Sequence, residues 1–70
     1  MIITVNGETT NWPESELTIT ELLLRHKVEK PDLVSVQVNG VFVNLKDYGT
    51  KVVLAHDEVD FLYFLGGGQA

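Results

Sequence analysis

Two Asn-Gly pairs, each set between runs of β-branched and apolar residues, limit most strongly what this chain can fold into. The pairs are Asn6-Gly7 and Asn39-Gly40. Asparagine and glycine both tolerate positive φ, which the two central positions of a type I′ hairpin turn require. We therefore predict two β-hairpins. The first joins Met1–Val5 to Glu8–Trp12, and the second joins Leu33–Val38 to Val41–Asn44.

One amphipathic helix is predicted between the hairpins. Thr18 and Glu21 have the spacing of a capping box, which marks a helix start. Residues at helical spacing form one face over about two and a half turns. They are Ile19, Leu22, Leu23 and His26. Lys27 and Lys30 are placed near the helix end, where cations suit the helix dipole, and Pro31 prevents continuation.

The remaining segments complete an α+β fold. Lys51–Leu54 and Glu58–Leu65 are predicted strands with a turn between them, whereas Glu14–Leu17 is predicted to be a connector. An amphipathic helix must bury its apolar face, and a sheet with one open face is the available partner. The first and last strands can pair in parallel, because the crossover between them contains the helix. We therefore predict a β-grasp, or ubiquitin-like, architecture, in which a mixed sheet of four to five strands packs on one helix. Residues 1–65 form this body, and residues 66–70 are expected to be a flexible glycine-rich tail.

Composition argues against several function classes. The chain has 70 residues and no cysteine, so a disulfide framework, a thiolate metal site and a cysteine nucleophile are ruled out. The net charge of −5 argues against nucleic-acid binding, because phosphate contacts depend on basic residues. No apolar run approaches the roughly 20 residues that span a bilayer, and no signal peptide is expected. The expected location is the cytoplasm.

No set of residues has the spacing of a catalytic or metal site. His26 continues the apolar helical face and His56 lies in a predicted turn, so neither is expected to be a metal ligand. We therefore predict that the chain is not an enzyme and binds no metal. Asp57, Glu58 and Asp60 form an acidic cluster, which is either solvated surface charge or a docking patch for a basic partner.

The last strand leads into three glycines, Gly66, Gly67 and Gly68. Such a thin segment is either a frayed terminus or a tail that enters another protein's active site, where it would reach about 10 Å from the body. Along the last strand, Val59, Phe61, Tyr63 and Leu65 alternate with Asp60, Leu62 and Phe64. If the first set is buried, Leu62 and Phe64 are exposed and available for docking. A shift of one residue in register would reverse the two faces.

The ordered set of segments resembles the ThiS family, the sulfur carriers of thiamine biosynthesis, which are related to the molybdopterin carrier MoaD and to ubiquitin. Four segments over residues 1–68 carry the resemblance. They are Ile3-Thr4-Val5-Asn6-Gly7-Glu8, Thr18-Ile19-Thr20-Glu21-Leu22-Leu23, Val36-Gln37-Val38-Asn39-Gly40, and Asp57-Glu58-Val59 with the following strand and Gly66-Gly67-Gly68. The family usually has a glycine where this chain has His56.

The resemblance implies a carrier with no bound cofactor, whose C-terminal glycine is activated by other proteins. A ThiF-like adenylyltransferase would use ATP and magnesium to adenylate the carboxylate of Gly68. Sulfur from a persulfide protein would then displace AMP and leave a thiocarboxylate for a ThiG-like thiazole synthase. Gly66 and Gly67 would thread into the partner, with Asp57, Glu58, Asp60, Leu62 and Phe64 as tentative docking residues.

The final dipeptide, Gln69-Ala70, departs from the family pattern because it holds the carbonyl of Gly68 in an amide bond. One hypothesis is that a C-terminal peptidase removes the dipeptide first. The alternatives are a carrier for another pathway, such as molybdopterin, cysteine or secondary-metabolite synthesis, and an interaction module without chemistry.

Overall fold

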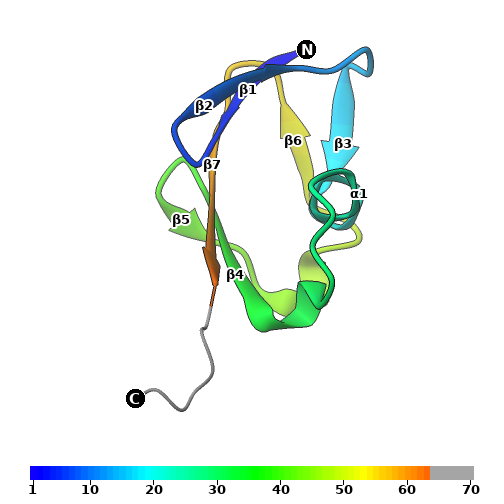
Figure 1. The fold of residues 1–70 in the computed structure, drawn as a ribbon, viewed down its shortest axis with the longest axis vertical. Coiled ribbons are helices and arrows are strands. Elements are labelled where there is room, and N and C mark those ends of the chain that lie inside the picture. Colours follow the sequence, from blue (N-terminus) through cyan, green and yellow to red (C-terminus); the bar gives the residue numbers. More distant parts are fainter. Residues whose placement is uncertain (64–70) are drawn as a thin grey trace.

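Two layers make up the molecule, a five-stranded mixed sheet and a covering layer that contains the helix (Figure 1). The computed structural model describes residues 1–63. The strands are β1 (Ile2–Val5), β2 (Glu8–Asn11), β3 (Glu16–Thr18), β4 (Val34–Val38), β5 (Val41–Phe42), β6 (Val52–Leu54) and β7 (Glu58–Tyr63). The helix is α1 (Ile19–Arg25), and Pro31–Leu33 and Leu45–Asp47 form short 3-10 helices. The large sheet has the order β2-β1-β7-β4-β5, and β3 pairs with β6 separately.

Both predicted hairpin turns are confirmed. Asn6 and Gly7 have φ values of 51° and 84°, and Asn39 and Gly40 have 53° and 82°, as a type I′ turn requires. The pairing of β1 with β7 is parallel, with Val5 opposite Val59. The first and last strands are therefore neighbours at the centre of the sheet, which confirms the predicted β-grasp arrangement.

The helix start is also as predicted. The hydroxyl of Thr18 accepts a hydrogen bond from the Glu21 amide at 3.1 Å, and the Glu21 carboxylate accepts one from the Thr18 amide at 2.9 Å. Ile19, Leu22 and Leu23 are buried on one face. The reciprocal bonds of the capping box satisfy donors that the first helical turn leaves free.

The helix end differs from the prediction. The helix stops at Arg25, with His26 as the C-cap, and Lys27 adopts a left-handed φ of 59°. The Lys27 amide donates to the Leu24 carbonyl at 3.0 Å and the Val28 amide donates to the Leu23 carbonyl at 3.1 Å, which is the pattern of a Schellman motif. Lys27 and Lys30 therefore lie beyond the helix.

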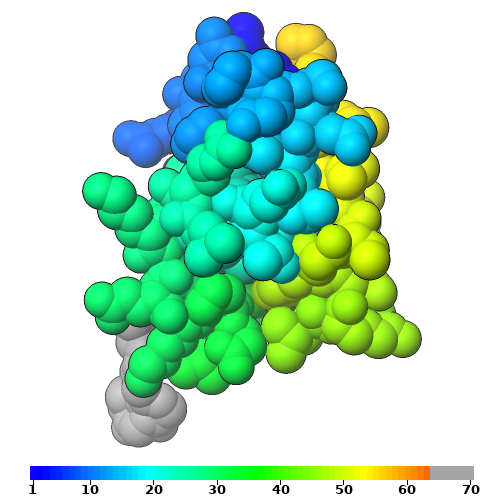
Figure 2. Space-filling model, turned by 90° about the vertical axis from the view of Figure 1, so that its right-hand side faces the viewer, coloured from blue at the N-terminus to red at the C-terminus, as the bar shows by residue number. Residues whose placement is uncertain are grey.

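The core lies between the inner face of the large sheet and the covering layer. Its buried side chains are Ile3, Val5, Leu17, Ile19, Leu22, Leu23, Val34, Val36, Val38, Tyr48, Val53, Val59 and Phe61. Burial of a Leu, Ile or Val side chain contributes about 1.5–3 kcal/mol to the free energy of folding. In Figure 2, which faces the covering layer, blue and cyan residues from the first third of the chain adjoin yellow residues around β6.

Three sequence-based assignments need correction. Glu14–Leu17 was predicted to be a connector, but Glu16–Thr18 is β3, which pairs with β6 and buries Leu17. The return strand of the second hairpin is β5, which is shorter than the predicted Val41–Asn44. Tyr63 was placed with the buried residues, yet it is 51% exposed.

Candidate docking face and carboxyl-terminal segment

Strand β7 holds the central position that the predicted site depends on. It pairs in parallel with β1 on one side and antiparallel with β4 on the other. Tyr63, the last described residue, pairs with Val34, and the glycines begin three positions later in the sequence. Gly66, Gly67 and Gly68, like Phe64, lie outside the described residues, so their proposed roles stay predictions.

Two asparagine side chains fasten β7 from the hairpin turns. The Asn6 amide oxygen accepts a hydrogen bond from the Phe61 amide at 2.7 Å. The Asn39 side chain accepts from the Glu58 amide at 2.9 Å and donates to the Asp57 carboxylate at 3.0 Å. Each asparagine therefore supplies both the positive φ of its turn and a side-chain contact to β7. This second role is not visible in the sequence, because an Asn-Gly pair indicates a hairpin turn but not a contact with a distant strand.

The outer face of β7 carries three of the predicted docking residues. Val59 and Phe61 are buried beneath the sheet, so Glu58, Asp60 and Leu62 point to the opposite face. Leu62 is 44% exposed. Of the two registers considered from the sequence, the structure therefore has the one that exposes Leu62.

Neighbouring strands extend this outer face. Asp60 lies opposite Gln37 of β4, and Leu62 lies opposite Ser35. Phe42 of β5 follows on the far side of Gln37 and is 62% exposed. The face thus combines carboxylates, small polar groups and separate apolar side chains.

Asp57, which was also predicted to be a docking residue, has a structural role in the turn before β7. Its carboxylate accepts hydrogen bonds from the Leu54 amide at 2.9 Å and from the Asn39 side chain at 3.0 Å. In the same turn, His56 adopts a left-handed φ of 72°, and its amide donates to the Ile2 carbonyl at 2.6 Å. The glycine-like backbone at this position is therefore kept, although the residue is a histidine.

Charge is distributed unevenly between the two layers. The chain has five basic residues, and they are Arg25, Lys27, Lys30, Lys46 and Lys51. None of them belongs to the five strands of the large sheet, whereas Glu8, Glu58 and Asp60 do. Strands that carry carboxylates and no cation favour docking of a basic surface to the sheet.

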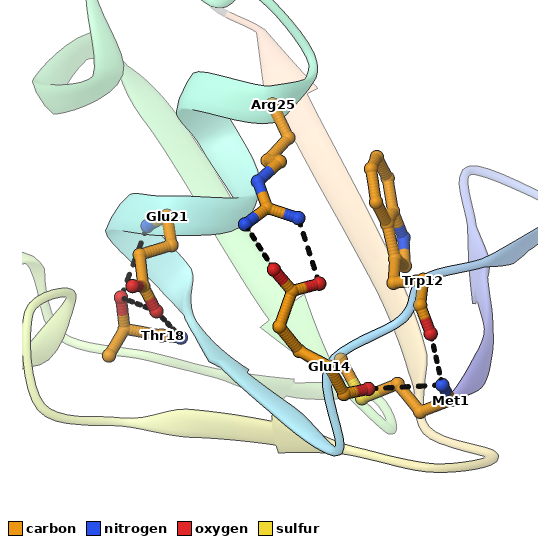
Figure 3. Close-up of polar contacts among 6 residues, drawn as sticks. All are labelled: Met1, Trp12, Glu14, Thr18, Glu21 and Arg25. Atoms are coloured by element: carbon orange, nitrogen blue, oxygen red, sulfur yellow. Dashed lines mark hydrogen bonds and ion pairs between the residues drawn. The ribbon is translucent and has the colours of Figure 1, made fainter.

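Among the described carboxylates, Glu14, which lies outside the large sheet, has the most strongly lowered pKa, and Figure 3 shows its contact with Arg25. The Glu14 carboxylate accepts two hydrogen bonds from the Arg25 guanidinium, at 2.9 and 2.5 Å, and this contact lowers the pKa of Glu14 to about 2. The Arg25 guanidinium also lies 5.5 Å from the centre of the Trp12 ring. Beside it, the Met1 amino group donates to the carbonyls of Trp12 and Glu14.

His26 lies at the edge of the core. His26 packs edge-on against Trp12 and Phe61, with ring centres 5.9 and 5.4 Å apart, and its Nε2 is buried without a hydrogen-bond partner. This position at the edge of the core agrees with the prediction. Within residues 1–63, no three histidine or acidic side chains converge as a metal site would require.

The match to known proteins covers nearly the whole chain. The model of the ThiS family matches residues 2–68. The chain belongs to the ThiS family. No curated protein gives a significant match. No helix within residues 1–63 is long and apolar enough to cross a membrane.

Solved structures agree with membership of the ThiS family. The chain is similar to a crystal structure of the thiamine biosynthesis protein ThiS from Geobacter metallireducens, with 38% identity and a TM-score of 0.85 over 97% of this chain and 100% of that one. A solution structure of a thiamine biosynthesis protein from the same organism has 38% identity and a TM-score of 0.81, over 100% of this chain and 91% of that one. The ThiS match extends past the described residues and includes all three terminal glycines.

Proposed function

We propose that the chain is a sulfur carrier for thiamine biosynthesis, and that its working group is the carboxylate of Gly68. The family match over residues 2–68 carries this proposal, because it includes the body and the glycines in one continuous segment. The similar structures from Geobacter metallireducens, named as thiamine biosynthesis proteins, support the same pathway. The carrier is not itself a catalyst. It supplies a reactive C-terminal carboxylate and a folded body that partner enzymes bind.

The proposed chemistry begins at the carboxylate of Gly68. One carboxylate oxygen attacks the α-phosphorus of ATP on a ThiF-like adenylyltransferase, and pyrophosphate leaves. The resulting acyl-adenylate is attacked at its carbonyl carbon by the terminal sulfur of a protein persulfide, AMP leaves, and the chain is joined to the sulfur donor by an acyl disulfide. A thiol of the partner proteins then attacks the donor's sulfur in that disulfide, so that the S–S bond breaks, a new disulfide forms between the two partner sulfurs, and the thiocarboxylate of the chain is released. Sulfur in the final thiocarboxylate is then donated to a ThiG-like thiazole synthase. In this proposal, magnesium and the groups that stabilise the phosphates belong to the partner enzyme.

The outer face of the sheet is the proposed docking surface for the partner. Glu58, Asp60 and Leu62 lie on it, beside the exposed ring of Phe42. Mixed apolar and charged groups suit a contact that must form and separate in each cycle. Phe64, also predicted to dock, is expected to continue this face.

Removal of Gln69-Ala70 is part of the proposal, because an amide at Gly68 cannot attack ATP. A chain that ends at Gly68 should support ATP–pyrophosphate exchange with its adenylyltransferase, and the chain that ends at Ala70 should not. A Gly67→Ala form of the trimmed chain is the steric control, and its exchange should be much slower. Native protein should include a form that ends at Gly68, with a fraction in which sulfur replaces one oxygen.

The capped terminus supports one alternative, an interaction module without chemistry. Under that alternative, native protein would consist only of chains that end at Ala70, and trimmed protein would remain inactive in the exchange assay. Either result with a competent partner enzyme would contradict the carrier proposal.

A further inference from the structure

A hollow beside the end of β7 has no part in the function described so far. It has a volume of about 340 Å³ and lies below the C-terminal end of α1. Its lining is His26, Lys27, Val28, Glu29, Lys30, Leu33, Val34 and Tyr63. Unlike the acidic outer face, it opens on the side of the sheet that the helix covers.

The position of the hollow ties it to the path of the tail. Tyr63 lines the hollow and is the last described residue of β7. A fully extended chain from residue 64 to residue 68 spans at most about 18 Å. An enzyme that encloses Gly68 must therefore come close to the body where β7 ends. At that point Leu62 faces the outer side and Tyr63 faces the hollow.

The walls of the hollow combine exposed apolar groups with cations. Leu33 is 53% exposed and Tyr63 is 51% exposed. Lys27 and Lys30 outweigh Glu29, so the lining carries a net positive charge on a chain whose net charge is −5. The hollow is therefore complementary to an apolar side chain that has a carboxylate beside it.

Lys27 is held in a backbone conformation that glycine adopts with less strain. Its φ of 59° belongs to the C′ position of the Schellman motif, where glycine is the usual residue. Lys27 thus lines the hollow at a cost in stability.

We propose that this hollow receives an apolar side chain, with an adjacent carboxylate, from the enzyme that adenylates the tail. The inference rests on the proposed function, since it takes that enzyme as the partner. The enzyme would then grip β7 from both sides of the sheet, at Leu62 on the outer face and at Tyr63 in the hollow.

Glycine substitutions can separate folding from docking. Lys27→Gly should raise the thermal midpoint of unfolding by about 4 °C, because it relieves the left-handed strain, yet it should weaken binding to the adenylyltransferase about threefold. His56→Gly is the matched control, because it relieves the same kind of strain at the opposite end of β7. It should raise the midpoint and leave the affinity unchanged.

Two further variants test the apolar part of the site. Tyr63→Ala should weaken binding about tenfold, as loss of an aromatic anchor does. Lys46→Ala, which removes a cation that does not line the hollow, should have no effect. All affinities would be measured by calorimetric titration of the adenylyltransferase with chains that end at Gly68.

Unchanged affinity in both Lys27→Gly and Tyr63→Ala would overturn this inference and leave the carrier proposal intact. If the chain that ends at Gly68 and carries no substitution did not bind the adenylyltransferase, the carrier proposal itself would fail, and the inference with it. Concentration-dependent self-association that Tyr63→Ala abolishes would assign the hollow to a second copy of the chain, which also contradicts the inference.

Discussion

At the residue scale, the contact between Glu14 and Arg25 connects the segment before β3 to the last turn of the helix (Figure 3). The two side chains keep 36% and 35% of their surface exposed, so water and salt screen the pair. The contact nevertheless holds the pKa of Glu14 at about 2, below the ordinary value of 4.5. Folding is therefore linked to the ionisation of this one carboxylate.

This linkage predicts a pH dependence with a definite sign. Because the folded-state pKa is the lower one, the unfolded chain binds more protons at Glu14 between pH 4.5 and about 2. The stabilisation from this group is fully present above pH 4.5 and is lost as the pH falls through about 2. Urea unfolding should show that Glu14→Gln is less stable than the unmodified chain at neutral pH, and that the difference shrinks on acidification.

Glu16→Gln is the control for this prediction, because Glu16 is an exposed glutamate that makes no ion pair within residues 1–63. The difference in free energy of unfolding between Glu16→Gln and the unmodified chain should not show the same decrease on acidification. A difference between Glu14→Gln and the unmodified chain that stays constant across the acid range would contradict the linkage.

Residue-level predictions from the sequence succeeded where the contact is local. Thr18 and Glu21 are three positions apart, so their capping box is visible in the sequence. Glu14 and Arg25 are eleven positions apart on different elements, and Asn6 contacts Phe61 across 55 positions. No spacing rule covers such pairs, since the fold alone brings them together.

At the element scale, turn and helix signals predicted most of the architecture. Strands β1 and β4 follow the apolar patterns of their sequences, and each hairpin has its Asn-Gly turn. Strand β3 was missed because three residues are too few to show an alternating pattern, and because its partner β6 begins 34 residues later. Tyr48 is also buried, although it lies between strands, where no alternating pattern points to a core residue.

The side-chain hydrogen bonds from the hairpin turns to β7 predict which backbone amide loses protection from hydrogen exchange when one of these bonds is removed. Asn39→Gly keeps a residue suited to the left-handed turn but removes the side-chain bonds to Glu58 and Asp57. The free energy of unfolding should fall by about 1–2 kcal/mol. Hydrogen exchange should quicken most at the Glu58 amide.

Asn6→Gly provides the reciprocal control. It removes the bond to the Phe61 amide, so exchange should quicken at Phe61 rather than at Glu58. If each variant accelerated hydrogen exchange equally at the Glu58 and Phe61 amides, the two turns would not be acting separately on β7.

At the scale of the whole molecule, the division into body and tail makes a prediction of its own. If residues 1–65 form the complete folded body, a chain truncated after Leu65 should unfold within about 1 °C of the full chain. The same truncated chain should fail in the adenylation assay. Calorimetry would show the first result, and a fall of several degrees would mean that residues 66–70 contribute to folding.

The candidate site was only partly predictable. The sequence indicated the outward direction of Leu62 in one of two registers, and the burial of Val59 and Phe61 selects that register. The sequence did not indicate that the Asp57 carboxylate is hydrogen-bonded within a turn, or that Tyr63 lines a hollow, because both features depend on how distant segments meet. The absence of cations from the large sheet became visible only when the strands were assigned.

The central place of β7 also has a mechanical consequence. A pull on the C-terminal end acts along the axis of β7, so it loads the hydrogen bonds to β1 and β4 in shear and requires many of them to break together. A pull that peeled an edge strand away from its neighbour would instead load the hydrogen bonds one at a time, and they would break in sequence. If the tail enters a partner enzyme as proposed, this arrangement allows the end to be withdrawn repeatedly while the fold stays intact.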